Sequence, residues 1–401
     1  MTPCDYDVLV VGGGLAGGSL ALALAGGPLR VGVIEGVSDQ ERKASPAGAR
    51  ALALTRGTAR ILESLGVWSR IEPEATPIRT VHVSDRGHFG KTRIEAEREG
   101  VAALGYVVRA RDVEDAVIAA LTSAPVDLIR PARVIGLQAG PDSVHVSLKR
   151  GEESLVLSAR LVVGADGSDS TVRKLAGIPL STRDYRQTAL VFEVVTGVDH
   201  GNVAYERFTA SGPLAFLPLG RRKCSVVWTL EPEEAEHLGA LPAAEFTSRL
   251  QEAFGHWLGP LTLASERQAF PLRLIQAGRM VAERGVLIGN AMHQIHPVAG
   301  QGFNLGLRDA AQLAERLLVK RSFGEDIGDA RFLEHYAAAR RRDLRDVIAF
   351  TDSVVRIFSN PFPPLALARN IGLLLLDCLP PAKHLLARRA MGLDGRLPRF
   401  T

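Results

Sequence analysis

The chain has 401 residues, of which 46% are hydrophobic and 23% charged, as in an ordinary globular protein too long for one compact core. We therefore expect two domains, or one domain with an insertion. Three scattered cysteines, Cys4, Cys224 and Cys378, offer neither a disulfide framework nor a metal spacing, and no run reaches the roughly 18 apolar residues of a membrane span. Asp5 stands where a secretory segment would need basic residues, so the sequence predicts a cytoplasmic protein.

The net charge of +4 is unevenly distributed along the chain. Residues 331–401 contain 12 Lys and Arg against 6 Asp and Glu, a net +6, which leaves −2 for residues 1–330. The basic character belongs to the C-terminal segment, so nucleic-acid binding is not indicated for the whole molecule.

Residues 6–35 predict a strand, a glycine turn, a helix and a second strand. Val8–Val11 is short, apolar and β-branched, as in a buried parallel strand. Three glycines follow at G-x-G-x-x-G spacing, in which the first makes a tight turn, the second lets the backbone approach a pyrophosphate and the third lets the helix pack on the sheet. The residues expected to bind a dinucleotide here are Gly12, Gly14, Leu15, Ala16 and Gly17.

The second strand is predicted at Val31–Ile34 and ends at Glu35, 18 residues after Gly17. The Glu35 carboxylate can accept hydrogen bonds from an adenosine ribose, and its charge favours a 2′-hydroxyl over a 2′-phosphate. Together with a helix N-terminus aimed at the phosphates, this arrangement favours a dinucleotide-binding turn over a purely structural glycine turn.

Residues 36–48 are polar and predict a loop. A helix is predicted after Arg50, with an apolar face that includes Ile61 and Leu62, and it stops at Gly66. Arg50 could contact the pyrophosphate, and a solvated surface position is its alternative.

Further along, two short strands are predicted around residues 85–87, and Asp112 is predicted to cap a helix. The chain becomes β-rich from Gln187 to Leu230, which we interpret as a sheet inserted into an α/β framework. The other predicted elements are strands at 161–163, 268–274 and 286–288 and helices at 242–254 and 307–318.

Two more motifs accompany the glycine turn. Residues 164–177, GADGSDSTVRKLAG, resemble the pattern G-A-D-G-x-x-S-x-x-R, and residues 289–309, GNAMHQIHPVAGQGFNLGLRD, resemble G-D-A-A-H-x-x-x-P-x-x-G-x-G-x-N. With these motifs the chain resembles the flavoprotein aromatic hydroxylases that have the p-hydroxybenzoate hydroxylase fold. The part HPVAGQGFNLGLRD is characteristic of the ubiquinone-biosynthesis hydroxylases.

Other stretches narrow the resemblance: VHVSDRGH (81–88), ERFTASGPLAFLPL (206–219), and TDSVVRIFSN with RNIGLLLLDCLPPAKHLLARRAMG near the C-terminus. They are similar to the 2-polyprenyl-6-methoxyphenol hydroxylase branch, and the likeness covers nearly the whole chain in order and spacing. The implied fold is α/β, a Rossmann-like FAD-binding domain with an inserted β-sheet substrate domain and C-terminal helices. The expected divisions are 1–75, 105–185 and 275–345 for the FAD-binding domain, 76–104 and 186–274 for the β-sheet domain, and 346–401 for the helical segment.

The implied cofactor is FAD. Gly300, Gly302 and Asn304 stand where a loop enters a helix, so backbone N–H groups and the positive helix end can stabilise a reduced, anionic isoalloxazine. Pro297 and Gly300 would let the backbone lie against the flavin ring. The cofactor residues expected in this stretch are Asn290, Pro297, Gly300, Gln301, Gly302, Phe303 and Asn304.

The resemblance also implies that Asp166 approaches the flavin and the NAD(P)H route, and that Arg50 and Arg109 contact the flavin. One position departs from the family pattern, because Asn290 stands where the aspartate of G-D-A-A-H helps hold the ribityl-phosphate region. An amide still forms hydrogen bonds but carries no charge. FAD affinity, or its dependence on pH, is therefore expected to differ.

His293 and His296 are three residues apart, but no third metal ligand lies nearby, so we expect hydrogen-bonded structural histidines and no metal. Aromatic residues of the β-rich region, such as Trp228, are interpreted mainly as core. The resemblance, however, makes this sheet the roof of the flavin and the lining of the substrate site. Its candidate substrate residues are Tyr205, Phe208, Phe216 and Pro218.

One dinucleotide fingerprint, not two, predicts that NAD(P)H reduces FAD by transient docking. The resemblance implies that reduced flavin and O₂ form a C4a-hydroperoxide that hydroxylates 2-polyprenyl-6-methoxyphenol to a 1,4-benzoquinol in ubiquinone biosynthesis. The sequence does not choose a catalytic base among backbone, water and a tyrosine such as Tyr205. Alternatives are another ring position or aromatic substrate, or a flavin-bearing assembly component of a quinone-biosynthesis complex; a flavin halogenase is disfavoured because W-x-W-x-I-P is missing.

Residues 347–393 predict a helical unit that meets the membrane surface. Ile371–Leu379 is apolar but too short to span a bilayer, and the following Lys383, Arg388 and Arg389 alternate with leucines, as in an interfacial helix. Packing of the leucines on the flavin domain is the alternative. Because a polyprenyl phenol lies in the bilayer, we expect peripheral contact with the inner face of the membrane.

Overall fold

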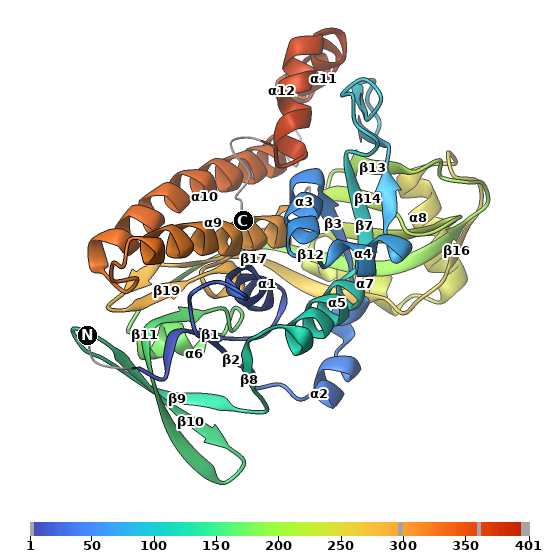
Figure 1. The fold of residues 1–401 in the computed structure, drawn as a ribbon. Helices are drawn as coiled ribbons and strands as arrows, with labels where there is room; N and C mark the ends of the chain where they lie inside the picture. Colours follow the sequence, from blue (N-terminus) through green and yellow to red (C-terminus); the bar gives the residue numbers. More distant parts are fainter. Residues whose placement is uncertain (1–3, 296–299, 359–361, 394–401) are drawn as a thin grey trace.

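The computed structural model describes residues 4–295, 300–358 and 362–393, and it contains two large sheets, a small one and helices that cover them (Figure 1). The mixed α/β fold class expected from the sequence is confirmed.

The first large sheet carries the predicted strand, glycine turn, helix and strand at its centre. Strand β1 pairs in parallel with β2 on one side and with β11 on the other. β11 is much longer than the predicted strand, because its first half continues into an antiparallel hairpin with β10. The path of the sheet is β18 (Val281–Ala282), β19 (Gly285–Leu287), β11 (Glu153–Gly164), β1 (Tyr6–Val11), β2 (Val31–Ile34) and β8 (Asp127–Ile129), with β10 (Val144–Arg150) and β9 (Arg133–Ala139) attached through β11.

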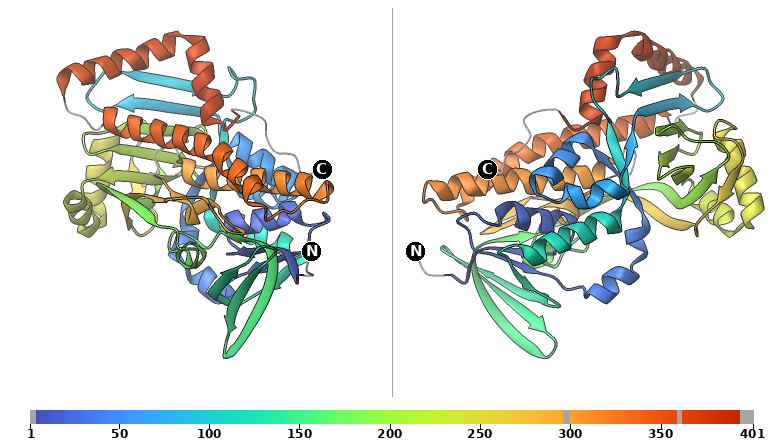
Figure 2. Two further views of the ribbon diagram at one scale, coloured as in Figure 1. Left: turned by 90° about the vertical axis from the view of Figure 1, so that its left-hand side faces the viewer. Right: turned by 45° about the vertical axis from the view of Figure 1, so that its right-hand side comes forward.

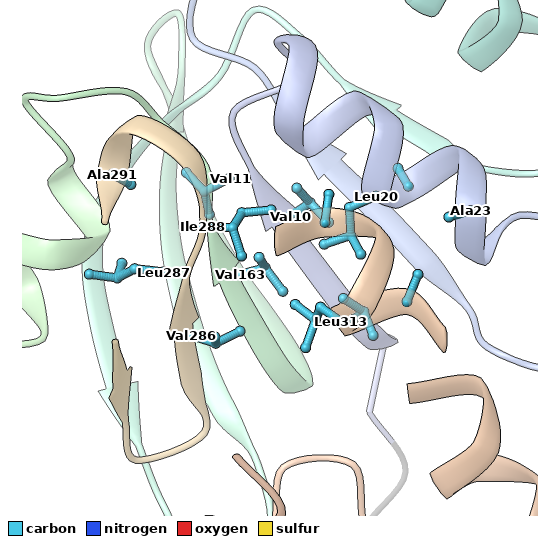
Figure 3. Packing of buried hydrophobic residues seen from close by; sticks show 14 of the residues in the cluster. Val10, Val11, Leu20, Ala23, Val163, Val286, Leu287, Ile288, Ala291 and Leu313 are labelled. Carbon is cyan, nitrogen blue, oxygen red and sulfur yellow. The ribbon is translucent and has the colours of Figure 1, made fainter. Parts of the chain in front are cut away.

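Two helices from distant parts of the sequence cover this sheet. Helix α1 (Leu15–Leu24) packs on α9 (Gln301–Ser322) and on α5 (Ala110–Ser123). Figure 3 shows Val10 and Val163 of the sheet beside Leu20 of α1 and Leu313 of α9, all of them fully buried. Burial of each such side chain contributes about 1.5–3 kcal/mol, so this layer fixes α1 and the middle of α9 against one face of the sheet.

The second large sheet is the β-rich insertion predicted from 187–230. Helices α7 (Pro232–Ala240) and α8 (Ala243–Phe254) cover one of its faces, and α7 was not predicted. Its path is β20 (His293–Gln294), β17 (Gln268–Ala277), β12 (Leu180–Thr196), β15 (Lys223–Leu230), β14 (Pro213–Pro218), β13 (Val203–Phe208), β5 (Thr80–Asp85) and β6 (Lys91–Glu95), with β16 (Leu261–Leu263) on β12.

A three-stranded sheet lies between the two large ones. Its middle strand β7 (Gly105–Arg109) pairs with β3 (Ala51–Thr55) and β4 (Thr76–Ile78). β3 occupies part of the segment where only a helix was predicted, and helix α3 (Arg56–Ser64) begins directly after it. The chain then continues through α4 (Trp68–Ile71) and the 3₁₀ turn η2 (Glu72–Glu74).

Three local predictions were wrong. The expected loop 36–48 contains α2 (Asp39–Ala44), which Ser38 and Glu41 stabilise as a capping box, and the 3₁₀ turn η1 (Pro46–Ala49). Asp112 does not cap its helix, since Arg109 is the N-cap residue and Asp112 lies in the first turn. Helix α9 begins at Gln301, not at Leu307, so the glycines that favoured a loop lie in its first turns.

The C-terminal part is helical, as predicted. Helix α10 (Ala330–Phe358) runs beside α9 and passes through the division expected at residue 346 (Figure 1). Helices α11 (Pro363–Cys378) and α12 (Pro380–Ala390) lie over the β5–β6 hairpin at one end of the molecule (Figure 2). Among the described helices, none is both long and apolar enough to cross a membrane.

Candidate functional site

The glycine turn has the steric roles that its spacing predicts. Gly12 has φ +99°, and a Cβ there would lie 2.5 Å from the carbonyl oxygen of Ala165. A Cβ on Gly17 would lie 2.0 Å from the oxygen of Gly12, so only glycine lets α1 approach the turn this closely. A Cβ on Gly14 would meet no protein atom within 4 Å. The middle position therefore faces open space, as a phosphate-binding backbone requires.

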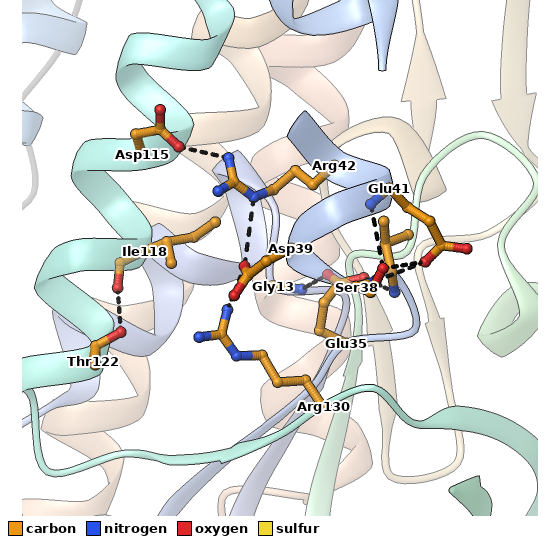
Figure 4. A network of polar contacts seen from close by, with 11 residues as sticks. Gly13, Glu35, Ser38, Asp39, Glu41, Arg42, Asp115, Ile118, Thr122 and Arg130 are labelled. Atoms are coloured by element: carbon orange, nitrogen blue, oxygen red, sulfur yellow. Dashed lines mark hydrogen bonds and ion pairs between the residues drawn. The ribbon is translucent and has the colours of Figure 1, made fainter. Parts of the chain in front are cut away.

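Glu35 holds this turn from the end of β2. One carboxylate oxygen accepts a hydrogen bond from the Gly13 N–H at 2.7 Å and the other from the Val37 N–H at 2.8 Å (Figure 4). The side chain is partly exposed, and a carboxylate has lone pairs beyond these two bonds. Glu35 thus shapes the turn and retains capacity for a ribose hydroxyl.

The second motif lies against the glycine turn. A Cβ on Gly12 would be 2.9 Å from the Cα of Asp166. The Asp166 carboxylate accepts hydrogen bonds from the Ser170 hydroxyl and from the N–H groups of Thr171 and Val172, and so caps α6 (Thr171–Leu175). Its side chain is therefore engaged inside the chain, and what it offers the site is the position of its loop.

Arg173 connects the second motif with the third. The side chain is buried, and its guanidinium donates to the carbonyl oxygens of Ser168 at 2.9 Å and Ala291 at 3.3 Å. Ala291 ends the 3₁₀ turn η3 (Gly289–Ala291), which also contains the exposed Asn290. A Cβ on Gly289 would lie 3.0 Å from the Cβ of Ala16, so Asn290 stands beside the start of α1.

The third motif continues at the N-terminus of α9. Gly300 has φ +60° and is the N-cap residue, and a Cβ on it would lie 2.9 Å from the Cβ of Ala53 on β3. The Asn304 amide donates to the carbonyl oxygens of Ala53 and Gly300 at 2.8 and 2.7 Å, and its oxygen accepts from the Thr55 N–H at 2.9 Å. Asn304 therefore fixes the helix start against β3.

The remaining predicted residues of this motif have different positions. Gln301 is buried, Phe303 packs against the core of the first sheet, and a Cβ on Gly302 would meet only Ile295, at 3.8 Å. Pro297 and His296 lie outside the described residues. The first turn of α9 thus presents backbone N–H groups at its positive end, without a side-chain cap.

A buried ionic network behind this helix start was not predicted. Asp309 accepts hydrogen bonds from the Arg340 guanidinium on α10 at 2.7 Å and from the Gly289 N–H at 3.2 Å, and it lies 2.7 Å from His293 Nε2. Tyr336 donates its hydroxyl to the Asp309 carbonyl oxygen. Burial by itself would raise the pKa of Asp309, but Arg340 and His293 lower it to about 2.

His293 is thus a hydrogen-bonded structural residue, as expected. Across the described residues, no group of three or more potential ligands could hold a metal. The network would have been hard to find in the sequence, because Arg340 lies 31 residues after Asp309 on another helix.

The two arginines that the resemblance assigns to the flavin lie on the border between the sheets. Arg109 forms a bidentate ion pair with Glu193 of β12, with N–O distances of 3.0 to 3.3 Å. The Arg50 guanidinium lies 5.3 Å from the centroid of the Phe270 ring. Both side chains thus contact the second large sheet, so any flavin contact would come in addition to these partners.

The candidate substrate residues lie on two different faces of that sheet. The Phe216 ring is fully buried and stacks on Phe254 of α8 at 3.8 Å, and Tyr205 meets the same ring at 5.4 Å. By strand alternation Pro218 belongs to the Phe216 face. Phe208 points the other way and stacks on Phe358 of α10 at 3.7 Å. Of the four, only Phe208 lies on the face opposite the α7–α8 layer, so the other three belong to the core.

Comparisons with known proteins agree with this architecture. Residues 5–351 match the FAD binding domain family. In solved structures, the p-nitrophenol 4-monooxygenase PnpA from Pseudomonas putida has a TM-score of 0.79 at 20% identity, with 97% of this chain and 98% of that one covered. The OxyS anhydrotetracycline hydroxylase from Streptomyces rimosus has a TM-score of 0.72 at 24% identity and covers 98% of this chain and 77% of its own.

The fold and the three joined motifs define an FAD-dependent aromatic monooxygenase with the p-hydroxybenzoate hydroxylase fold. The ubiquinone hydroxylase UbiL of Rhodospirillum rubrum is 40% identical over 392 residues, which are 96% of this chain and 89% of the relative. The 3-demethoxyubiquinol 3-hydroxylase of Escherichia coli is 33% identical over 98% of this chain and its own full length. The chain belongs to the FAD-dependent ubiquinone-biosynthesis hydroxylases, and FAD is its cofactor.

Proposed function

We propose that this protein hydroxylates a polyprenylated phenol in ubiquinone biosynthesis, with 2-polyprenyl-6-methoxyphenol as substrate, a 1,4-benzoquinol as product, and NAD(P)H and O₂ as co-substrates. The observation that carries the proposal is the juxtaposition of the α9 N-terminus and β3 at Gly300 and Ala53. Ala51 of β3 in turn packs in one apolar cluster with Ala204 of the second sheet. A planar ring held between the helix start and this sheet face would therefore lie among apolar side chains.

The residues of the first region fit FAD. The open position at Gly14 leaves room for a pyrophosphate, the start of α1 offers it backbone N–H groups, and Glu35 keeps acceptor capacity for the adenosine ribose. FAD, when bound, is reduced by NAD(P)H and activates O₂ for transfer of one oxygen atom to the ring. The chain itself binds and orients the cofactor, and its apolar cluster around Ala204 excludes water from the reacting ring.

The ring position rests on the resemblance to one branch of the family. A different position has specific support, because the Escherichia coli relative is named for hydroxylation at position 3 of demethoxyubiquinol. The FAD-loaded protein should be supplied with NAD(P)H and with 2-prenyl-6-methoxyphenol or the matching demethoxyubiquinol, each with a short prenyl chain. Mass spectrometry and NMR of the product then identify the ring carbon that gains oxygen.

Three outcomes are distinguishable. Oxidation of NAD(P)H coupled to formation of hydroxylated 2-prenyl-6-methoxyphenol supports the proposal. Product formed only from the demethoxyubiquinol indicates hydroxylation at the other ring position. Bound FAD without product from either phenol would favour the assembly component of a quinone-biosynthesis complex.

We also propose that α11 and α12 contact the membrane surface. Along α11 the exposed Leu367, Ile371, Leu374 and Leu375 have the i, i+4, i+7, i+8 spacing of one helix face. Asn370 and Leu373 of the same helix are buried. Leu379 after α11 and Leu385 of α12 are exposed as well, and so are Arg388 and Arg389. An apolar helix face with adjacent basic residues is typical of interfacial binding.

One residue of the expected basic set has another role. Lys383 is buried, and its ammonium group donates to Asp377 at 2.7 Å, which helps to lower the pKa of that carboxyl. The basic contribution to membrane binding should therefore come from Arg388 and Arg389. One face of the α12 region, with Ala387 and Met391, packs beside Ile94 of the β5–β6 hairpin, so only the remaining surface of this region is available to a membrane.

Co-sedimentation with liposomes tests the membrane contact. We expect the full chain to bind vesicles of anionic lipid, and the triple variant Leu367→Ser, Ile371→Ser, Leu375→Ser to lose most of that binding. A matched control replaces the exposed Ile135, Leu155 and Val156 of the β9–β11 region by serine and should bind like the unchanged chain. Equal binding of all three proteins would contradict the proposal and leave the hydroxylase function intact.

A further inference from the structure

Glu206 lies on the sheet face that the proposed function assigns to the substrate. Successive residues of a strand point to opposite faces, and Tyr205 points into the α8-covered core. Ala204, Glu206 and Phe208, which alternate with Tyr205 along β13, therefore share the other face. Ala204 packs against the three-stranded sheet, and Phe208 stacks on Phe358. The carboxyl group is thus placed between these two apolar contacts.

The neighbouring strands offer Glu206 no counter-ion. It pairs with Ala215 on β14 and with Val83 on β5. Within the part of the chain that the structure describes, its carboxyl group forms no hydrogen bond or ion pair, although the side chain is only partly exposed. Desolvation by burial raises its pKa to about 7.

The other charged groups around this face are paired with one another. Glu193 is bound by Arg109 and Lys223, and Asp85 at the end of β5 is bound by Arg369 of α11. Asp377 of α11 receives Lys383. Among the described residues of this face, Glu206 is therefore the carboxylate that remains available to a ligand.

The position of Glu206 connects it to the cofactor region. Ala51 packs in the same cluster as Ala204, and Ala53, two residues further on the same side of β3, lies against Gly300. The α9 N-terminus, where the flavin ring is expected, and Ala204, two residues before Glu206 on the same sheet face, therefore both border β3. A phenol ring between them can present its hydroxyl group to Glu206.

We propose that the Glu206 carboxylate is the base that accepts the phenolic proton of the substrate. The role rests on the proposed hydroxylase function and names a residue for a step that the sequence left open. The O–H bond of the phenol breaks, its proton passes to the carboxylate oxygen, and the electron pair stays on the phenolate. Conjugation of that pair raises electron density at the ring carbon that bonds to the incoming oxygen atom. That carbon then releases its hydrogen as a proton to water, and Glu206 returns its proton to the phenolic oxygen.

A base of this kind suits the chemistry. A phenol such as a tyrosine side chain has a pKa of about 10, so it is almost fully protonated at neutral pH. A carboxyl group whose pKa lies near the working pH combines a substantial ionised fraction with useful basicity. An ordinary exposed glutamate would be a weaker proton acceptor.

The test compares Glu206→Gln with the unchanged FAD-loaded protein, using 2-methoxyphenol with a dimethylallyl chain as probe. We expect kcat to fall at least about 100-fold, with KM and FAD content nearly unchanged. In the unchanged protein kcat should rise with pH through an inflection near 7, and the variant should lack that inflection. A ring-fluorinated probe, whose hydroxyl group is more acidic, should recover part of the lost rate. Rescue by substrate acidity is not expected of a merely structural residue.

Two further variants keep the test decisive. Glu252→Gln changes an exposed glutamate on α8, on the far side of the sheet, and should match the unchanged protein. Glu206→Asp keeps the acid on a shorter side chain and should retain the inflection at a reduced kcat, even if Glu206→Gln folds poorly.

The inference is overturned if Glu206→Gln or Glu206→Asp loses the inflection near pH 7 while kcat stays unchanged. It is also overturned if Glu206→Gln keeps both the inflection and the kcat of the unchanged protein. The inference would likewise be overturned if Tyr205→Phe, and not Glu206→Gln, removed the inflection of kcat near pH 7. Failure of the unchanged protein to hydroxylate any phenol would instead contradict the proposed function, so the two failures are distinguishable.

Discussion

The cofactor side and the substrate side of this site are built in different ways. On the cofactor side the polar side chains of the motifs, Glu35, Asp166 and Asn304, bind backbone groups of the chain itself. What they present to a ligand is mainly backbone. On the proposed substrate side, strand alternation places Phe216 on one face of the sheet and Glu206 on the other, so a ligand there would meet side chains.

This difference indicates what each motif residue contributes. A motif that shapes backbone tolerates few substitutions for steric reasons, because the ligand and the neighbouring chain share the same small space. A sheet face sets its chemistry by which side chains point outward, and one residue can change there without altering the strand. Substitutions on the two sides should therefore impair different properties of the protein.

Gly14→Val should have the largest effect. Its Cβ meets no protein atom within 4 Å, so the fold should survive while the branched side chain fills the space of the pyrophosphate. We expect complete loss of bound FAD at a melting temperature close to that of the unchanged apoprotein, measured by flavin absorbance and thermal unfolding. The control Gly17→Val places a Cβ 2.0 Å from the Gly12 oxygen and should lose stability as well as FAD. A stoichiometrically yellow Gly14→Val protein would contradict this assignment.

Asp309→Asn tests the network that holds the cofactor loop. The change removes one of the two carboxylates that pair with the buried Arg340, the other being Asp343, so the cost should be about 3 kcal/mol, the lower end of the range for a broken buried ion pair. Because the folded pKa of Asp309 is about 2, its ionised form stabilises the fold above the unfolded pKa of about 4. That contribution, about 3 kcal/mol, is lost as the pH falls from 4 to 2.

Urea unfolding at pH 7 and at pH 3 measures both effects. Asp309→Asn should be less stable at pH 7, and its free energy of unfolding should decrease less on acidification than that of the unchanged protein. An identical pH dependence of the two proteins would show that Asp309 is not the group responsible.

The sequence predicted the backbone geometry of the glycine turn well because its signals are local. Each glycine of the turn acts on atoms that the flanking strand and helix bring to it, and Glu35 ends the very next strand. The substrate side depends on information from far along the chain. Alternation separates Tyr205 from Glu206, but which face receives α8 is decided by residues 243–254, so Tyr205, Phe216 and Pro218 were proposed as substrate residues.

A local cap and two long-range ion pairs explain the other differences. The capping box of α2 lies in a polar stretch whose turn-like composition indicated a loop. Asp309 obtains its buried partner Arg340 only through the packing of α10 on α9, and Lys383, which the sequence assigned to the interfacial helix, pairs with Asp377 through the packing of α12 on α11.

Phe216→Ala and Phe208→Ala sharpen the contrast between the two faces. Phe216 is fully buried against Phe254, so its truncation should cost roughly 3 kcal/mol of folding free energy and leave the KM for the phenol unchanged in the folded fraction. Phe208 stacks on Phe358 at the substrate face, so Phe208→Ala should raise KM. Denaturant unfolding and steady-state kinetics separate the two effects. A raised KM in Phe216→Ala alone would reverse the assignment of the faces.

Asn290→Asp should have the smallest effect, and it tests the single departure from the family pattern on the cofactor side. Asn290 is exposed beside the start of α1, so the change leaves the core untouched and the melting temperature of the apoprotein should not move. A carboxylate accepts charge-assisted hydrogen bonds from the ribityl hydroxyl groups, whereas an amide oxygen offers neutral ones, so FAD should bind about threefold more tightly near neutral pH. The gain should disappear as the new carboxylate is protonated below pH 4. Fluorescence titration of the apoprotein with FAD measures it, with Asn290→Ser as the uncharged control. Weaker FAD binding in Asn290→Asp than in Asn290→Ser would place this side chain against the phosphates, where negative charge is unfavourable.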